Sequence, residues 1–461
     1  MRFVPTMVLL ALVLPAFSPA QTAPSAQELK LTVSPAAAPV PALRYRLMPT
    51  FADKTPGNAA QTYLLGLLLA PKFTEEQEKQ LDELLKVPLD KFPRDEAREF
   101  LDCYKGTFLQ LDTAARREYC RWDLPIREEK FATLLPHLGE MRRMTRLLSV
   151  RARLQLADGR IDDAVYTLQT GFAMASHLND QTLLIQSLVA DAMVRIMLER
   201  TRELTSVTGA PNLYWALSEL PHPLSQMGPS MRMEQATLDI AYPDLRLAAT
   251  GAIAPERWTQ IGDQLLGMVT EGDGSRPLDK VTTAAITAKT LPAARAYLVG
   301  HGLPQAQVDN MPPAQAVAMY CAADYARWSD DMCKWYGLPY WQAREGLARV
   351  EQQFGERHDR ESNPLLIVLP SASRAFASMA RTEREIAAMM TVEAVRAFAA
   401  SHKGSLPKSL DDLPPAPAPL DPFTGQPFVY ETTGSTFTLS SPDPSGNRPQ
   451  DELRVEVTLK P

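Results

Sequence analysis

The stretch MRRMTRLLSVRARLQLADGRIDDAVYTLQTGFAMASHL, residues 141–178, decides the fold class of this chain. Apolar residues recur every three or four positions on both sides of Asp158-Gly159-Arg160, which is the spacing of one face of a helix. The two apolar stripes consist of Met144, Leu148 and Ala152, and of Ala164, Leu168, Phe172 and Ala175. A glycine between polar residues breaks such a pattern. The stretch therefore predicts an antiparallel helical hairpin.

This hairpin resembles a single tetratricopeptide repeat. Its small-residue positions are filled by Ala152, Ala164 and Gly171, and Gly159 stands at the turn. Arg151 and Gln155 depart from the repeat pattern. A shift of about 34 residues finds no good second copy, whereas arrays need roughly three repeats to bury a continuous core. An ordinary hairpin in an irregular helical bundle is the alternative interpretation.

The N-terminus predicts export. Met1 and Arg2 precede an apolar run from Val4 to Phe17, and Ser18-Pro19-Ala20 supplies the small residues that a signal peptidase reads. Residues 1–20 are therefore interpreted as a signal peptide, and the mature protein as periplasmic or secreted. An uncleaved anchor is the alternative, although the run is shorter than the roughly 20 residues that span a bilayer.

Composition narrows the classes of partner. The longest later apolar cluster, Leu365 to Leu369, stops at Pro370. The stretch from Leu183 to Leu198 contains Gln186, Asp191 and Arg195, so no transmembrane segment is expected after signal cleavage. The net charge is -6, and no basic tract is present that could neutralise a phosphate backbone. Nucleic acid is therefore not an expected partner.

The chain divides by composition into three further parts. Residues 21–42 are rich in Ala, Pro and Ser and predict a flexible or extended linker. Residues 43–370 have helical periodicity, punctuated by many of the 39 prolines, and predict an irregular multi-helix body, for which a solenoid-like arrangement is one form. Residues 371–461 predict a long helix, from Ala372 to Ser401, followed by strands. The fold class is mainly α with a small C-terminal α+β unit.

Three strands are expected in that unit. They cover Phe428–Glu431, Thr436–Ser440 and Leu453–Leu459, with a hairpin turn at Gly434. Apolar and polar residues alternate in the last strand, as in a sheet with one buried face. The pattern predicts a three-stranded antiparallel sheet.

The terminal block resembles the carboxy-terminal half of the type II secretion pseudopilins. The matching elements are the long helix, Gly404-Ser405-Leu406-Pro407, Ser409-Leu410-Asp411-Asp412-Leu413, Asp421-Pro422-Phe423-Thr424-Gly425, Phe428 with Tyr430, and the loop Ser440–Asn447. Major pseudopilins hold calcium in their final loop, so the resemblance implies Asp443 and Asp451 as calcium ligands; a solvated loop is the alternative. Because some 350 residues precede the helix here, the chain is not expected to be a filament subunit.

The mature chain as a whole is similar to a group of uncharacterised exported bacterial proteins that combine a helical body with this tail. Within the body, the similarity rests on Thr55-Pro56-Gly57-Asn58-Ala59-Ala60, Ala114-Ala115-Arg116-Arg117 and Trp122. The resemblance carries no activity with it.

The cysteines allow one disulfide. Cys103 and Cys120 lie on two expected helices, and a chain reversal between residues 106 and 112 would bring them together. Cys321 and Cys333 share an expected helix from Pro313 to Tyr336, so they are roughly 18 Å apart, too far for a bond. Packing in the core is the alternative for all four.

The expected helix from Pro313 to Tyr336 also carries an aromatic-rich face, which indicates core packing or a partner surface. The face consists of Val317, Tyr320, Tyr325, Trp328 and Trp335.

No catalytic or cofactor motif is present. The six histidines show no helical metal spacing, and no nucleophile elbow, phosphate loop or dinucleotide fingerprint occurs. Ser405 and Lys408 have the spacing of the serine–lysine enzymes, but Pro407 between them rules out the helix on which that motif works. No cofactor is therefore expected, and the chain is interpreted as more consistent with a binding protein than with an enzyme.

These observations favour a non-enzymatic interaction or scaffold protein of the cell envelope with a protein partner. Two alternatives stay open. One is an envelope hydrolase whose catalytic groups leave no local motif. The other, suggested by the C-terminal block, is an accessory of a pilus or a type II secretion machine.

Overall fold

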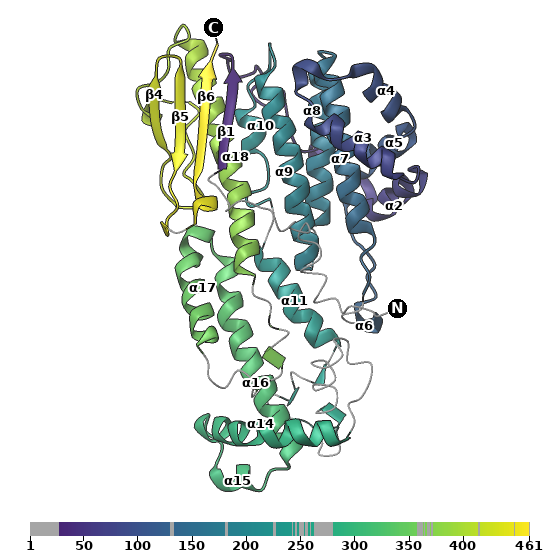
Figure 1. Cartoon of the computed structure of the whole chain (residues 1–461), viewed down its shortest axis with the longest axis vertical. Helices are drawn as coiled ribbons and strands as arrows, with labels where there is room; N and C mark the ends of the chain where they lie inside the picture. The colour runs from purple at the N-terminus through teal and green to yellow at the C-terminus, as the bar shows by residue number, and fades with distance from the viewer. Residues whose placement is uncertain are drawn as a thin grey trace. The chain divides into compact units, whose positions relative to one another are not determined.

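A computed structural model gives the fold (Figure 1). It describes residues 27–129, 133–179, 183–224, 227–241, 243–244, 247–248, 253, 257–258, 260–261, 280–356, 363, 365–366, 369, 372–413, 415–446 and 448–460. The predicted signal peptide, residues 1–20, and the start of the predicted linker lie outside these residues.

The described residues form mostly helices, with a four-stranded sheet and a separate two-stranded sheet, which confirms the predicted fold class of mainly α with a small C-terminal α+β unit. It divides into two compact units. The large unit contains Gln21–Trp122, Leu135–Gln226 and Ala375–Pro461, and the small unit contains Asp123–Leu134 and Met227–Arg374. The C-terminal segment from Ala375 onward belongs to the same unit as the N-terminal helices.

The helices of the large unit follow the predicted periodicity. They are α2 (Ala59–Leu69), α3 (Glu75–Lys86), α4 (Arg94–Asp102), α5 (Lys105–Ala115), α7 (His137–Ala157), α8 (Ile161–Leu178), α9 (Leu184–Ser206), α10 (Tyr214–Ser218) and α18 (Ser373–Ser401), the last from Ala375 onward. The helical hairpin predicted at residues 141–178 is confirmed as α7 and α8. Gly159 makes the turn with φ +73°, a conformation that glycine adopts at no steric cost.

A glycine also sets the spacing between α8 and α9. A Cβ added at Gly171 would lie 2.1 Å from the sulfur of Met197. Any other residue at this position would push the two helices apart or displace the methionine, because protein interiors are closely packed. Gly171 therefore lets α9 pack directly on the hairpin.

The sheet has four strands, not the three that were predicted. β4 (Val429–Thr433), β5 (Thr436–Ser441) and β6 (Leu453–Leu459) are antiparallel neighbours, with Gly434 at the first turn. The fourth strand, β1 (Gln27–Val33), pairs in parallel with β6 at the edge of the sheet, so the order is β1-β6-β5-β4. Part of the expected linker is therefore a strand, because its alternating Leu29, Leu31 and Val33 supply an apolar face.

A buried ion pair ties this sheet region to the helices. Glu393 and Arg396 of α18 are 0% and 1% exposed, and their side chains contact at 2.8 Å. Arg396 also donates hydrogen bonds to the backbone oxygens of Ser34 (2.9 Å) and Ala210 (3.0 Å). The guanidinium thus joins α18 to the segment after β1 and to the loop after α9.

The small unit consists of α6 (Ile126–Glu129), α11 (Met227–Ala241), α14 (Lys280–Gly300), α15 (Gln305–Asp309), α16 (Pro313–Cys333), a 3-10 turn (Lys334–Gly337) and α17 (Tyr340–Gly355). Most of the aromatic-rich face of α16 is buried: Val317, Tyr320 and Trp328 are at most 7% exposed. These three side chains therefore form core. Among the described helices, none has the length and apolar content required to span a bilayer.

Candidate functional site: an exposed leucine face

The segments that resemble the exported bacterial group come together in the large unit. β2 (Thr55–Asn58) pairs in parallel with β3 (Arg117–Tyr119) as a separate two-stranded sheet. Arg117 Nη1 donates to the backbone oxygen of Pro56 at 2.7 Å, and the Asn58 side chain bonds both backbone groups of Arg121 at 2.9 Å. These contacts fix the point at which α2 begins.

The inner side of α2 packs closely on α5. Asn58 caps the helix, since its side-chain oxygen accepts a hydrogen bond from the backbone nitrogen of Ala60 at 3.1 Å. The buried residues of α2 are Ala59, Ala60, Tyr63 and Gly66. A Cβ on Gly66 would lie 3.2 Å from that of Gln110. Small residues thus face inward, where the helices approach.

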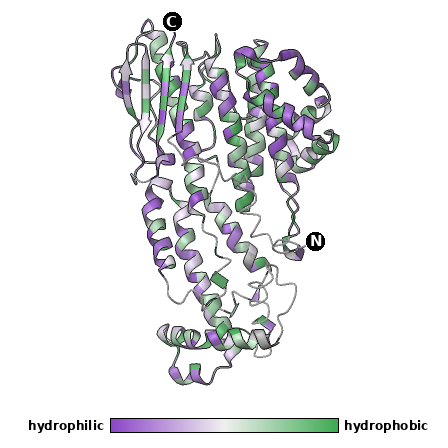
Figure 2. Cartoon of the chain, viewed as in Figure 1, coloured by the Kyte–Doolittle hydropathy of each residue, from purple (hydrophilic) through white to green (hydrophobic). Residues whose placement is uncertain are grey.

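The outer side of α2 is apolar and exposed. Leu64 and Leu65 are each 46% exposed, Leu68 82% and Leu69 51%. On α5, Leu109 is 63% exposed and lies one turn from Gly106, where a Cβ would be 3.9 Å from Leu69. We call Leu64, Leu65, Leu68, Leu69 and Leu109 the leucine face. Figure 2 shows the apolar character of α2, which Figure 1 labels.

On an ordinary surface helix the apolar stripe is buried, whereas on α2 the leucine stripe is exposed. The exposed positions 61, 64, 65, 68 and 69 follow the i, i+3, i+4, i+7, i+8 pattern that normally points into a core, and four of the five are leucines. No residue of α2 carries a charge. A helix that is apolar on all sides is normally buried on all sides. The outer stripe of α2 therefore has the chemistry of a contact surface.

Sequence reasoning missed the leucine face. Its signal was present in the charge-free run Tyr63-Leu64-Leu65-Gly66-Leu67-Leu68-Leu69. The run is too short for a membrane span and gives the spacing of a core helix. Only the contacts with α5 reveal which side of the helix stays uncovered.

Two aromatic–histidine contacts lie close to this region. Tyr63 is fully buried, and its hydroxyl lies 2.9 Å from Nδ1 of His177. Trp122 stacks on His137 with the ring centroids 4.0 Å apart. Burial lowers the pKa of His137 to about 4, and burial followed by the charge of Lys54 lowers the pKa of His177 to about 4. Both imidazoles are therefore neutral at neutral pH: His137 packs against Trp122, and His177 hydrogen-bonds to the Tyr63 hydroxyl.

A polar network explains the departures from the repeat pattern. Arg151 binds both carboxylate oxygens of Asp112, at 2.8 and 3.0 Å, and its Nε donates to Thr167 at 2.9 Å. The Thr167 hydroxyl in turn donates to Gln155 at 2.7 Å. Arg151 and Gln155 thus join α5, α7 and α8, and their polar groups are occupied within the fold.

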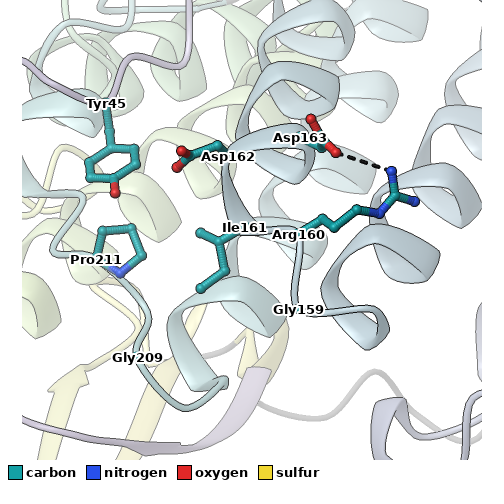
Figure 3. Close-up of a pocket in the computed structure, with 8 residues that line it drawn as sticks. All are labelled: Tyr45, Gly159, Arg160, Ile161, Asp162, Asp163, Gly209 and Pro211. Atoms are coloured by element: carbon teal, nitrogen blue, oxygen red, sulfur yellow. Dashed lines mark hydrogen bonds and ion pairs between the residues drawn. The ribbon is translucent and has the colours of Figure 1, made fainter.

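An open depression of about 390 Å³ lies beside the turn between α7 and α8 (Figure 3). Tyr45, Ile161 and Pro211 line one part of it, and the ion pair between Arg160 and Asp163, at 3.1 Å, lies in another part. The side chains of Arg160 and Asp163 are 50% and 54% exposed. This pair is therefore hydrated and is not a preorganised acid–base group.

A second open depression, of about 770 Å³, lies at the C-terminal end of α18. Ser405 and Lys408 both line it, in the loop that follows the helix. Asp411 and Asp412 also line it. Asp412 accepts a hydrogen bond from the Ser409 backbone nitrogen at 3.0 Å, and Asp411 accepts one from the Ser409 hydroxyl at 3.3 Å. These carboxylates hold the loop in its conformation.

The predicted disulfide is not formed. All four cysteines fall within the described residues, and none of them is joined in a disulfide. α5 runs without interruption from Lys105 to Ala115, so the chain does not reverse between residues 106 and 112 as expected. Cys103 remains exposed at the end of α4, whereas Cys120 is buried after β3.

The two predicted calcium ligands have protein partners. Asp443 accepts hydrogen bonds from the backbone nitrogens of Ser445 (2.9 Å) and Arg448 (2.7 Å). Asp451 is buried and accepts a hydrogen bond from Nε of Arg381 at 2.8 Å. Within the described residues, no three His, Cys, Asp or Glu side chains gather in a way that could hold a metal ion.

One histidine and one acid from different elements meet in the large unit. His222 Nδ1 lies 3.3 Å from Glu383 Oε2, and the other oxygen of Glu383 accepts a hydrogen bond from the Leu224 nitrogen at 2.7 Å. Both oxygens of the carboxylate thus fasten the loop after α10 to α18. This arrangement indicates a structural role for the pair.

No known protein family, curated protein or solved structure matches this chain.

Proposed function

We propose that the protein is a non-enzymatic scaffold of the cell envelope that binds another protein through the leucine face. The observation that carries this proposal is the outward leucine stripe of α2, whose spacing is that of a buried surface. Exposed apolar stretches of this kind mark protein–protein interaction sites. The predicted signal peptide places the interaction outside the cytoplasm.

The surroundings of the leucine face favour binding over chemistry. Asp112 of α5, Arg151 of α7 and Thr167 of α8 are engaged with one another, and burial lowers the pKa of His137 and of His177 so that both are neutral. These contacts thus stabilise the helices that support the face. An apolar face on a helix binds with a smaller loss of conformational entropy than a flexible segment does, because the backbone that carries it is already ordered.

Site-specific photocrosslinking in intact cells tests this proposal. A photoreactive amino acid replaces Leu68 in the exported full-length chain, and another replaces Leu420, a 58% exposed leucine in a loop of the same unit. We expect one defined protein adduct from position 68 and none of comparable yield from position 420. An equal yield of diffuse adducts from both positions would contradict the proposal.

A further inference from the structure

We propose that the partner on the leucine face is a second copy of this chain, which docks α2 against α2 about a two-fold axis. This inference rests on the proposed function and names its partner. A two-fold interface uses the same surface on both subunits, so that surface must complement itself.

The apolar part of the surface meets this condition. α2 has 11 residues and no charge, and its exposed stripe consists of leucines and Gln61. A partner that carried charges into this contact would lose their hydration and find no opposite charge on α2. Another charge-free leucine stripe brings no charge into the contact. The α2 of a second copy supplies such a stripe.

The rim of the surface also complements itself. Lys105, the first residue of α5, directly precedes Gly106, where a Cβ would lie 3.9 Å from Leu69. Lys105 forms an exposed ion pair with Asp102 at 3.1 Å, with side chains 74% and 56% exposed. The rim therefore presents one charge of each sign, and a two-fold axis can set each beside its opposite on the other copy.

The spacing of the stripe suits helix-on-helix packing. Leu64 and Leu68, like Leu65 and Leu69, are four residues apart and form two parallel ridges along α2. Such ridges fit into the grooves of a second helix with the same spacing. The contact is short, so we expect a dissociation constant roughly in the micromolar range.

Sedimentation velocity of the mature full-length chain over a range of concentrations measures this association. The expected result is a concentration-dependent shift to twice the monomer mass. Leu68→Glu should weaken the dimer by about tenfold or more. The matched variant Leu420→Glu, at an exposed leucine outside the face, should leave the dissociation constant unchanged. A wild-type chain that stays monomeric at about 100 micromolar would overturn the inference.

A charge-swap experiment tests the symmetry of the contact. Leu68→Glu and Leu68→Lys each place like charges together in a two-fold dimer, and both should be monomeric. An equimolar mixture should form heterodimers, because the two substituted side chains then attract each other across the axis. Failure of the mixture to associate would overturn the α2–α2 geometry.

These outcomes separate the inference from the proposed function. If the purified chain is monomeric but position 68 crosslinks in cells to a protein other than itself, the scaffold function holds and the second copy is excluded. If purified monomers instead bind lipid vesicles through Leu68, both proposals fail. Binding to lipid vesicles through Leu68 would be identified by loss of vesicle binding in Leu68→Glu but not in Leu420→Glu.

Discussion

Glu393 and Arg396 form an ion pair from which solvent is excluded on every side, three residues apart on α18. Glu393 accepts further hydrogen bonds from the Thr205 hydroxyl at 3.0 Å and the Leu213 nitrogen at 3.1 Å. The Arg396 side chain reaches the backbone of Ser34 and Ala210. Two charges of one helix thus hold segments that are far apart in sequence.

Removal of one member of this pair should destabilise the fold strongly. Arg396→Met leaves the Glu393 carboxylate buried without its counter-charge, which costs about 3–5 kcal/mol. The free energy of unfolding, measured by circular dichroism in urea, checks this value. Asp95→Ala is the control: it breaks an ion pair with Arg98 whose side chains are 100% and 50% exposed, leaves Arg98 its second partner, Asp158, and should cost less than about 1 kcal/mol. Equal losses in the two variants would contradict this account of the pair.

The contact between Gly171 and Met197 allows a test of helix packing. Gly171→Ala should destabilise the protein by about 1–3 kcal/mol, because its new methyl group overlaps the methionine side chain. Met197→Ala in the same chain should restore part of that loss by making room. Gly139→Ala, in the first turn of α7 with open space around it, is the matched control and should not destabilise. A Gly171→Ala variant as stable as Gly139→Ala would show that the helices are not this close.

Acid should destabilise the large unit through His137. Burial lowers its folded-state pKa to about 4, whereas the unfolded value is about 6.5. Between these two pKa values, the unfolded chain binds a proton at His137 that the folded chain does not bind. His137 therefore leaves the free energy of unfolding unchanged above about pH 6.5 and lowers it as the pH drops toward 4. His137→Phe keeps an aromatic ring beside Trp122 and should reduce this loss by about 2–3 kcal/mol. An unchanged pH profile in the variant would refute this assignment.

His222 should have the opposite effect. Its hydrogen bond to Glu383 raises its pKa in the folded state. The pair therefore makes its full contribution to the free energy of unfolding below about pH 6.5, the pKa of histidine in the unfolded chain. This contribution is lost as the pH rises through the higher pKa of His222 in the folded chain. In Glu383→Gln, the free energy of unfolding should no longer depend on the protonation of His222 above about pH 6.5. Its decrease at acid pH, which comes from His137, should remain. If Glu383→Gln changed the free energy of unfolding only at acid pH, the contact between His222 and Glu383 would be ruled out.

Local sequence patterns predicted the parts of the fold that they determine. The hairpin at residues 141–178, the helix near residues 372–401 and strands β4, β5 and β6 follow from periodicity and turn residues. β1 was not predicted. Apolar and polar residues alternate over Gln27–Val33, but this strand lies in a segment whose overall composition indicates a linker. Its partner, β6, is more than 400 residues away. Pairing over such a distance leaves no local signal.

The candidate site shows the same limit. The leucines of α2 predict a helix with a core-like stripe, but which side is covered depends on where Gly66 meets α5. The break expected between residues 106 and 112 does not occur, because Phe108 and Leu111 keep α5 continuous by packing into the core. Tertiary contacts therefore decided both the helix that supports the leucine face and the separation of Cys103 from Cys120.

Cysteine accessibility in intact cells tests the central claim most directly. Leu68→Cys and, separately, Leu420→Cys are introduced in a Cys103→Ser background, which removes the exposed native thiol. Labelling rates with a membrane-impermeant maleimide are then compared between cells that export the chain and dilute purified protein. If the leucine face is covered by a partner, position 68 should react about tenfold more slowly in cells while position 420 reacts equally fast in both. Equal rates at position 68 in the two settings would show that the face is bare, and would contradict the account.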